Sequence, residues 1–280
     1  MKFRVSAKVG FEVFSPSTVL LNVQPFPTGN QIIEEEFFSA SPMVPVKEFF
    51  STAGEKRFSI LEVPEPGFIT FSYAATVQNA MRIIPAEGLN DVPIAHMPVS
   101  VLPYLNPSRY CQSDRLYKLA AHKFGHIDHG FERVIAIRDW IYDNVEYRSG
   151  YTSAQTSAFD TITEQVGVCR DFAHLGIALC RALTIPARYF TGYAYQLQPP
   201  DFHACFEAYL GGHWVLFDAS KLVPLNGLIK IATGTDATET AFASSFGNLR
   251  FQTLEVSATL LEGDFRAVDA SSTTQGYSFS

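Results

Sequence analysis

The first 95 residues alternate between apolar and polar positions. The alternation is clearest over residues 3–9 and again over residues 68–75. A period of two places successive side chains on opposite faces of a strand, so that one face can be buried. Proline and glycine interrupt the pattern often, as they do between the strands of an antiparallel sandwich. We therefore expect residues 1–95 to form an antiparallel β-sandwich.

After a proline-bearing linker, residues 93–107, the apolar positions change to intervals of three and four. This is the spacing of one face of an α-helix. The pattern predicts three helices, over residues 113–124, 131–145 and 168–183. Pro186 ends the last one, because proline lacks a backbone donor and disfavours helical conformation in the residue before it.

Strand-like runs follow the third helix. They cover residues 188–195, 203–210, 213–218 and 249–260. These helices and strands belong to the second domain, which we expect to be of the α+β class and to extend over residues 96–262. Residues 263–280 are polar and rich in Ser and Thr, and we expect them to form a tail that frays.

Gly211 and Gly212 are the signal for a two-residue hairpin, because glycine tolerates positive φ. Such a loop pairs Leu210 with His213, Tyr209 with Trp214, Glu207 with Leu216 and Cys205 with Asp218. His203 and Asp218 then lie on one face of the hairpin as diagonal neighbours, within reach of each other. The register alone therefore predicts a His–Asp pair.

Cys169 falls in the first turn of the third predicted helix. Unpaired N–H groups and the positive end of the helix dipole stabilise an anion there, and the thiolate is the reactive form of cysteine. Cys169, His203 and Asp218 supply a nucleophile, a base and an orienting acid. The alternative is that Cys169 is a small buried side chain, as we expect for Cys180 farther along the same helix.

Five segments of the sequence resemble the transglutaminase-like superfamily of papain-related thiol enzymes, in particular its bacterial cysteine protease branch. These segments are residues 104–110, 139–141, 167–174, 200–204 and 211–218. The resemblance implies a papain-like catalytic core over roughly residues 100–235, preceded by a β-rich domain. It also implies a Cys169–His203–Asp218 triad that transfers an acyl group through a thioester.

One position departs from the pattern of that branch. An aromatic residue often follows the alanine after the histidine, whereas this chain has Cys205. Since Cys205 also faces Asp218 in the predicted hairpin, it is an alternative nucleophile. A strand centre, however, offers a thiolate no helix dipole.

The groups that would stabilise an oxyanion are only partly defined. The backbone N–H of Cys169 is one candidate donor. The segment before it offers three candidates for the second donor, and spacing does not choose between Tyr147, Tyr151 and Gln165.

Three histidines suggest a competing metal site. His122, His126 and His129 have the spacing that places imidazoles on one helix face. Two glycines make the end of that helix uncertain, and no Glu lies between the first two histidines, as a zinc peptidase would require. We therefore expect no metal and no cofactor.

The composition excludes several classes of protein. A net charge of −7 and a pI near 5.5 argue against a nucleic-acid partner, which requires clustered Lys and Arg. No apolar run reaches the length of a membrane helix, and the N-terminal segment lacks the features of a signal peptide. Four cysteines in 280 residues are too few for a disulfide framework. A catalytic thiol is safest in a reducing compartment, so we expect a cytoplasmic protein.

These observations predict a cysteine peptidase or amidase that acts on a peptide, protein or other amide substrate. Transfer of the acyl group from glutamine to an amine is an alternative, because it passes through the same thioester. A non-catalytic binding module on the same fold is a second alternative. The sequence does not predict the oligomeric state.

Overall fold

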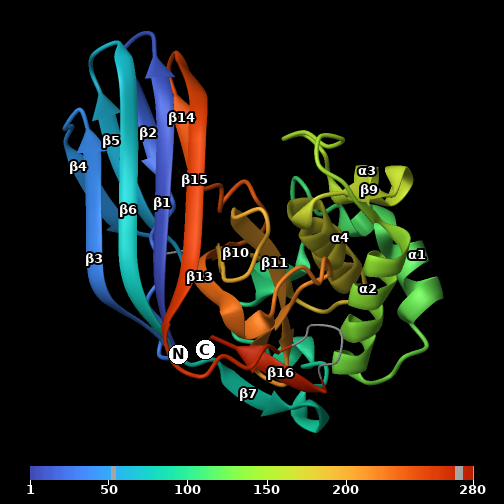
Figure 1. Cartoon of the computed structure of the whole chain (residues 1–280). Coiled ribbons are helices and arrows are strands. Elements are labelled where there is room, and N and C mark those ends of the chain that lie inside the picture. Colours follow the sequence, from blue (N-terminus) through green and yellow to red (C-terminus); the bar gives the residue numbers. More distant parts are fainter. Residues whose placement is uncertain (52–54, 269–273, 280) are drawn as a thin grey trace.

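Two four-stranded antiparallel sheets face each other and form a β-sandwich at one end of the molecule (Figure 1). The computed structural model describes residues 1–51, 55–268 and 274–279. The first sheet has the order β15 (Leu249–Glu262), β1 (Lys2–Val13), β6 (Gly67–Asn79) and β3 (Gln31–Ser41). The second has the order β14 (Ala243–Phe246), β2 (Ser17–Leu21), β5 (Arg57–Val63) and β4 (Val46–Phe50).

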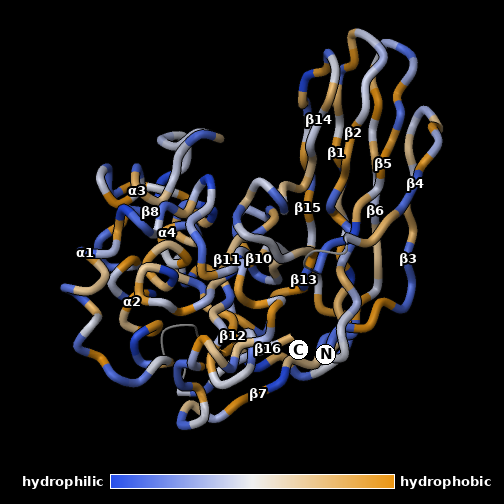
Figure 2. Tube along the Cα trace, turned by 180° about the vertical axis from the view of Figure 1, so that it is seen from behind, coloured by the Kyte–Doolittle hydropathy of each residue, from blue (hydrophilic) through white to orange (hydrophobic). Residues whose placement is uncertain are grey.

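Alternation along the strands creates the core of the sandwich. In β1 the odd-numbered apolar side chains from Phe3 to Val13 are buried, and most of the intervening polar residues are partly exposed. Figure 2 shows hydrophobic and hydrophilic residues interspersed along the strands of the sandwich. Phe71 and Val77 of β6 join the same apolar cluster. The sandwich predicted for the N-terminal region is confirmed.

The rest of the molecule is a mixed α and β unit around a second antiparallel sheet. Its strand order is β12 (His213–Phe217), β11 (Phe202–Leu210), β10 (Ala187–Ala194) and β13 (Leu228–Gly234). Helix α4 (Cys169–Ala182) packs on one face, and Phe172, Leu175 and Leu179 lie in a cluster with Ala204 and Phe206 of β11. The expected α+β class is therefore confirmed.

Three more helices surround α4 (Figure 1). They are α1 (Ser113–Phe124), α2 (Gly130–Asn144) and α3 (Ala158–Glu164). The predicted helices agree with α1, α2 and α4 to within one residue at each end, whereas α3 was not predicted. None of the helices in the described residues is long and apolar enough to cross a membrane.

Short elements connect these units. They are the paired strands β8 (Glu146–Tyr147) and β9 (Val166–Gly167), and the 3-10 helices Ala86–Gly88, Ile94–His96, Leu102–Leu105 and Leu225–Gly227. The parallel pairing of β8 with β9 is important for the site, because it places Tyr147 beside Gly167, two residues before Cys169.

The last long strand belongs to the sandwich rather than to the unit with α4. The sequence-based boundary placed residues up to 262 with the catalytic domain, yet β15 pairs with β1 along its whole length, and β14 pairs with β2. Alternation shows that one face of a strand is buried, but it does not identify the neighbouring strand. The unit with α4 is thus inserted between strands of the sandwich.

The expectation of a frayed C-terminal tail is wrong for residues 274–279. Strand β16 (Gln275–Ser278) pairs with β7 (Arg82–Pro85), and the Phe279 ring stacks on Phe190 at 5.5 Å between centroids. Phe279 is fully buried. The Ser- and Thr-rich composition of the tail obscured these few apolar side chains, and they are sufficient to dock it.

Candidate active site

Cys169 is the first residue of α4 and is half-buried. The helix begins there because Asp171 accepts a hydrogen bond from the Val168 N–H at 3.0 Å and so satisfies one of the free donors of the first turn. Gly167 is required just before it, because a Cβ atom at this position would lie 2.8 Å from the Cβ of Asp171. The local sequence therefore fixes the thiol at a helix N-terminus.

His203 and Asp218 meet as the hairpin register predicted. Leu210 pairs with His213 and Glu207 with Leu216, although the ladder ends at Phe217, one residue before the predicted partner of Cys205. The Nε2 atom of His203 lies 2.9 Å from Oδ2 of Asp218. Both side chains are about 1% exposed, so water does not compete for this contact.

Electrostatics favour the charged forms of this pair. Burial disfavours the imidazolium of His203, but the carboxylate of Asp218 outweighs it and holds the pKa of His203 well above its usual value. Burial likewise opposes ionisation of Asp218, yet His203 and hydrogen bonds from Ser220 hold the pKa of Asp218 below its usual value. The arrangement is that of an imidazolium oriented by a carboxylate.

The other ring nitrogen of His203 is available for the thiol. Within the described part of the chain, Nδ1 is buried and has no hydrogen-bond partner. Cys169 lies close enough to the ring to help raise the pKa of His203. Both residues line a single cleft of about 470 Å³. His203 thus faces the carboxylate through one nitrogen, and its second nitrogen remains free for Cys169.

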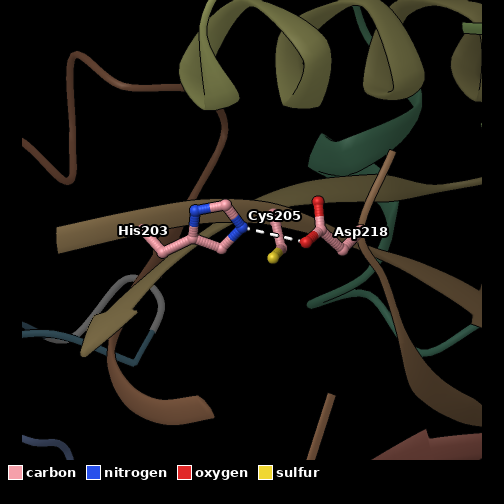
Figure 3. A group of neighbouring side chains, drawn as sticks. All are labelled: His203, Cys205 and Asp218. Atoms are coloured by element: carbon pink, nitrogen blue, oxygen red, sulfur yellow. Dashed lines mark hydrogen bonds and ion pairs between the residues drawn. The ribbon is translucent and has the colours of Figure 1, made fainter. Parts of the chain in front are cut away.

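Cys205 is the third side chain of this group, and Figure 3 shows it next to the His203–Asp218 contact. Burial and the Asp218 carboxylate raise the pKa of Cys205 to about 12, so this thiol stays protonated. Cys205 does not line the cleft that holds Cys169. Cys180 is fully buried, and burial raises its pKa. Of these three thiols, only Cys169 borders the cleft.

The three histidines considered as a metal site do not form one. Helix α1 ends at Phe124, so His126 and His129 do not continue its face. Over residues 1–51, 55–268 and 274–279, the one group of three potential metal ligands with donor atoms within 4.8 Å is His203, Cys205 and Asp218. Two of these are already hydrogen bonded to each other.

Among the three candidates for the second oxyanion donor, Tyr147 interacts with Cys169. Burial and the neighbouring Cys169 thiol raise the pKa of Tyr147 to about 12, so its hydroxyl remains a donor. The Arg148 guanidinium instead lies over the Tyr151 ring, 4.2 Å from the ring centroid. Gln165 is exposed at the end of α3, in left-handed conformation.

Two features of the site were missed in the sequence. Ser220 donates to Oδ1 of Asp218 through its backbone N–H at 2.8 Å and its hydroxyl at 2.7 Å. The segment of residues 237–242 forms a wall of the cleft through Ala237, Thr240, Ala241 and Phe242. The Asp-x-Ser spacing of residues 218–220 is a turn signal that could have indicated the contact between Ser220 and Asp218. An aspartate side chain often accepts a hydrogen bond from the residue two positions later. The wall carries no motif.

Two family models and a solved structure match large parts of this chain. The family model described as "Transglutaminase-like superfamily" matches residues 118–219, and that described as "Bacterial transglutaminase, N-terminal domain" matches residues 1–100. A crystal structure of "a Putative Cysteine Protease from Cytophaga hutchinsonii" is 51% identical in sequence to this chain. The match covers 99% of this chain and 97% of the other, with a TM-score of 0.96.

Curated relatives are more distant. An uncharacterized protein of Mycobacterium leprae is 29% identical over 116 residues, which are 39% of this chain and 42% of the relative. An uncharacterized protein of Mycobacterium bovis is 30% identical over 182 residues, or 64% of this chain and 55% of the relative. The chain spans about half the length of these mycobacterial proteins.

Proposed function

Because this chain belongs to the transglutaminase-like superfamily, we propose that it is a cysteine hydrolase that cleaves a peptide or amide bond through a thioester on Cys169. The observation that carries the proposal is the buried His203–Asp218 pair, whose imidazole borders the same cleft as a half-buried thiol at a helix N-terminus. A thiol, a base and an orienting acid in this order are the parts that acyl transfer requires.

In the first half of the proposed reaction, the Cys169 thiolate attacks the substrate carbonyl carbon. The Cys169 N–H and the Tyr147 hydroxyl are the proposed donors to the oxyanion. His203 then gives its proton to the leaving amine, the C–N bond breaks, and the acyl group remains on sulfur as a thioester.

In the second half, water attacks the thioester carbonyl. His203, now neutral, accepts a proton from this water, and the C–S bond breaks to release the acid and restore the thiolate–imidazolium pair. Asp218 keeps the ring oriented throughout. If an amine replaced the water, the same intermediate would lead to transamidation.

Alkylation tests the activated thiol before any substrate is known. We expect iodoacetamide at pH 6 to modify Cys169 rapidly and selectively, with peptide mapping to locate the modified residue. Cys205→Ala should label like the wild type. His203→Ala should abolish the selectivity, and Asp218→Asn should weaken it less, because the carboxylate acts through the imidazole.

Slow labelling, or labelling spread equally over the four cysteines, would contradict the proposal and favour a non-catalytic module. With a substrate in hand, Cys169→Ala should abolish turnover without changing the circular dichroism spectrum. Product analysis with and without a primary amine then separates hydrolysis from transamidation.

The proposed location is the cytoplasm, where the four free cysteines would stay reduced. Thiol quantitation on protein from its native host tests this, since a native disulfide would contradict it.

A further inference from the structure

One wall of the cleft beside Cys169 is aromatic, and the rest of the lining includes small side chains as well as Tyr110 and Tyr189. Phe202 and Phe242 form this aromatic wall, while alanines at positions 154, 204, 237 and 241 leave the space open. The two rings are stacked, with centroids 5.6 Å apart and planes inclined by 29°. Both side chains are only partly buried, so the wall presents apolar surface to the cleft.

The aromatic wall joins the two units of the fold. Phe202 packs edge-on against Tyr193 of β10 at 5.2 Å, and Phe242 contacts Phe251 of β15 at 6.1 Å. Phe242 directly precedes β14, which returns to the sandwich. The position of this ring in the cleft is therefore set by the sandwich as well as by the sheet that carries His203.

The segment that leads to Phe242 is held rigidly. Asp236 accepts hydrogen bonds from the Tyr110 N–H at 3.0 Å and from the Thr238 N–H and hydroxyl at 2.9 and 2.6 Å. The Ala237 N–H donates to Nε2 of His174 at 3.2 Å. Burial lowers the pKa of His174 to about 3, so the ring stays neutral and remains an acceptor. A wall fixed in this way can select a side chain without first becoming ordered.

The charges at the cleft disfavour an acidic ligand group. Two cations line the cleft. Arg170 is paired with the buried carboxylate of Asp171 at 2.8 Å, and His203 is paired with that of Asp218 at 2.9 Å. Asp201, at the rim beside the aromatic wall, has no ion-pair partner among the residues that the structure describes. Burial raises the pKa of Asp201 and outweighs the opposite effects of the Phe202 N–H and of the His203 charge.

We propose that the Phe202–Phe242 wall is a substrate subsite that takes an aromatic or branched apolar side chain on the acyl part of the substrate. This proposal rests on the proposed function, because it requires the acyl group to reach Cys169. A pocket of this kind discriminates mainly by the apolar area that it buries, so Phe and Leu should be preferred to Ala by at least about 10-fold. Glu should be the least favoured, since it would lie near Asp201.

Peptidyl electrophiles test the subsite without a known substrate. Tripeptidyl acyloxymethyl ketones with Phe, Leu, Ala or Glu at each of the two positions nearest the ketone would be compared by the second-order rate of Cys169 alkylation, followed by intact mass. Iodoacetamide, which has no peptide, serves as the reference. We expect Phe and Leu to accelerate alkylation at one of the two positions.

Substitutions test whether the aromatic wall causes this side-chain preference. Phe242→Ala should remove the preference while iodoacetamide labelling stays unchanged, and Phe242→Leu should keep the Leu preference but lose much of the Phe preference. Phe246→Ala is the matched control, because Phe246 is 59% exposed on β14 and does not line the cleft. Equal rates for all side chains, with iodoacetamide still labelling Cys169, would overturn the subsite alone. If iodoacetamide also failed to label Cys169, this result would contradict both the proposed function and the subsite.

Discussion

Ser220 fixes the acid of the proposed triad. It occupies Oδ1 of Asp218 with two hydrogen bonds and thereby leaves Oδ2 for His203. A carboxylate bonded on one oxygen only could rotate and present either oxygen to the ring. We therefore propose that Ser220 is a positioning residue, which would act on the thiol through Asp218 and His203.

We expect Ser220→Ala to slow Cys169 alkylation at pH 6 by about 10-fold, because a hydrogen bond to a charged group contributes roughly 1.5 kcal/mol. Loss of the hydroxyl should raise the pKa of Asp218 and lower that of His203. A plot of the alkylation rate against pH should have a plateau where the proposed thiolate–imidazolium pair exists. In Ser220→Ala this plateau should end at a lower pH than in the wild type. Ser220→Thr keeps the hydroxyl and should restore the profile. An unchanged profile in Ser220→Ala would argue for a purely structural role.

The Tyr147 hydroxyl is the proposed side-chain donor to the oxyanion. If its hydroxyl donates to the oxyanion, Tyr147→Phe should lower kcat by roughly 100-fold and leave KM nearly unchanged, since the charge develops only in the transition state. Iodoacetamide labelling forms no oxyanion, so its rate should change little. Tyr151→Phe, from the same segment, is the control. A loss confined to KM would place Tyr147 in substrate binding.

Among the secondary-structure elements, the docked C-terminal strand makes an unexpected contribution to stability. Phe279 is fully buried against Phe190, so Phe279→Ala should lower the free energy of unfolding by about 3–5 kcal/mol, the usual loss for a buried phenylalanine. Urea denaturation measures this. Phe50→Ala, at a position that is 56% exposed, should change stability much less. Equal effects of the two substitutions would show that the strand is not docked in solution.

The sequence predicted those elements whose signal is local. Helix α4 carries its own apolar stripe and is followed by Pro186, and the Gly211-Gly212 loop sets the register of β11 with β12. The proximity of His203 and Asp218 follows from that register, and so it could be predicted from the sequence. The helix α3, in contrast, has only seven residues and too few turns to show a period.

Features that depend on distant partners could not be predicted. Strand β15 lies beside β1, almost the full chain length away, and nothing in the alternation of β15 identifies β1. The wall at Phe242 has the same origin, since it exists only where the chain crosses between the two units. The aromatic pair with Phe202 is therefore a property of the fold rather than of a motif.

A buried ionic cluster joins the sandwich to the sheet of the unit with α4. Glu55, two residues before β5, pairs with Arg188 of β10 at 2.9 Å and with Lys230 of β13. Both cations also pair with Glu207. Lys230 and Glu207 are fully buried. Burial opposes ionisation of Glu55, but Lys230 and Arg188 outweigh it and lower the pKa of Glu55 to about 2.

This cluster should make stability depend on acid pH. The pKa of Glu55 is lowered from 4.5 to about 2, so its contribution is present above about pH 4.5 and is lost as the pH falls toward 2. We expect Glu55→Gln to lower the free energy of unfolding by about 3 kcal/mol at pH 7, and by much less near pH 2.5. Urea unfolding at both values checks this. A difference that stayed constant with pH would exclude the ionic origin.

The return of β14 and β15 to the sandwich has a consequence for biosynthesis. Strand β1 is made before β6 and β15. It pairs on one side with β6, yet its other edge stays open until residue 262 has left the ribosome. Helix α4 and the sheet that carries His203 are complete before then. The growing chain thus holds a nearly finished thiol site while its earliest strand still awaits its last neighbour. The Phe242 ring also contacts Phe251 of β15, so its packing is complete only when the sandwich closes, and the proposed selectivity would be acquired last.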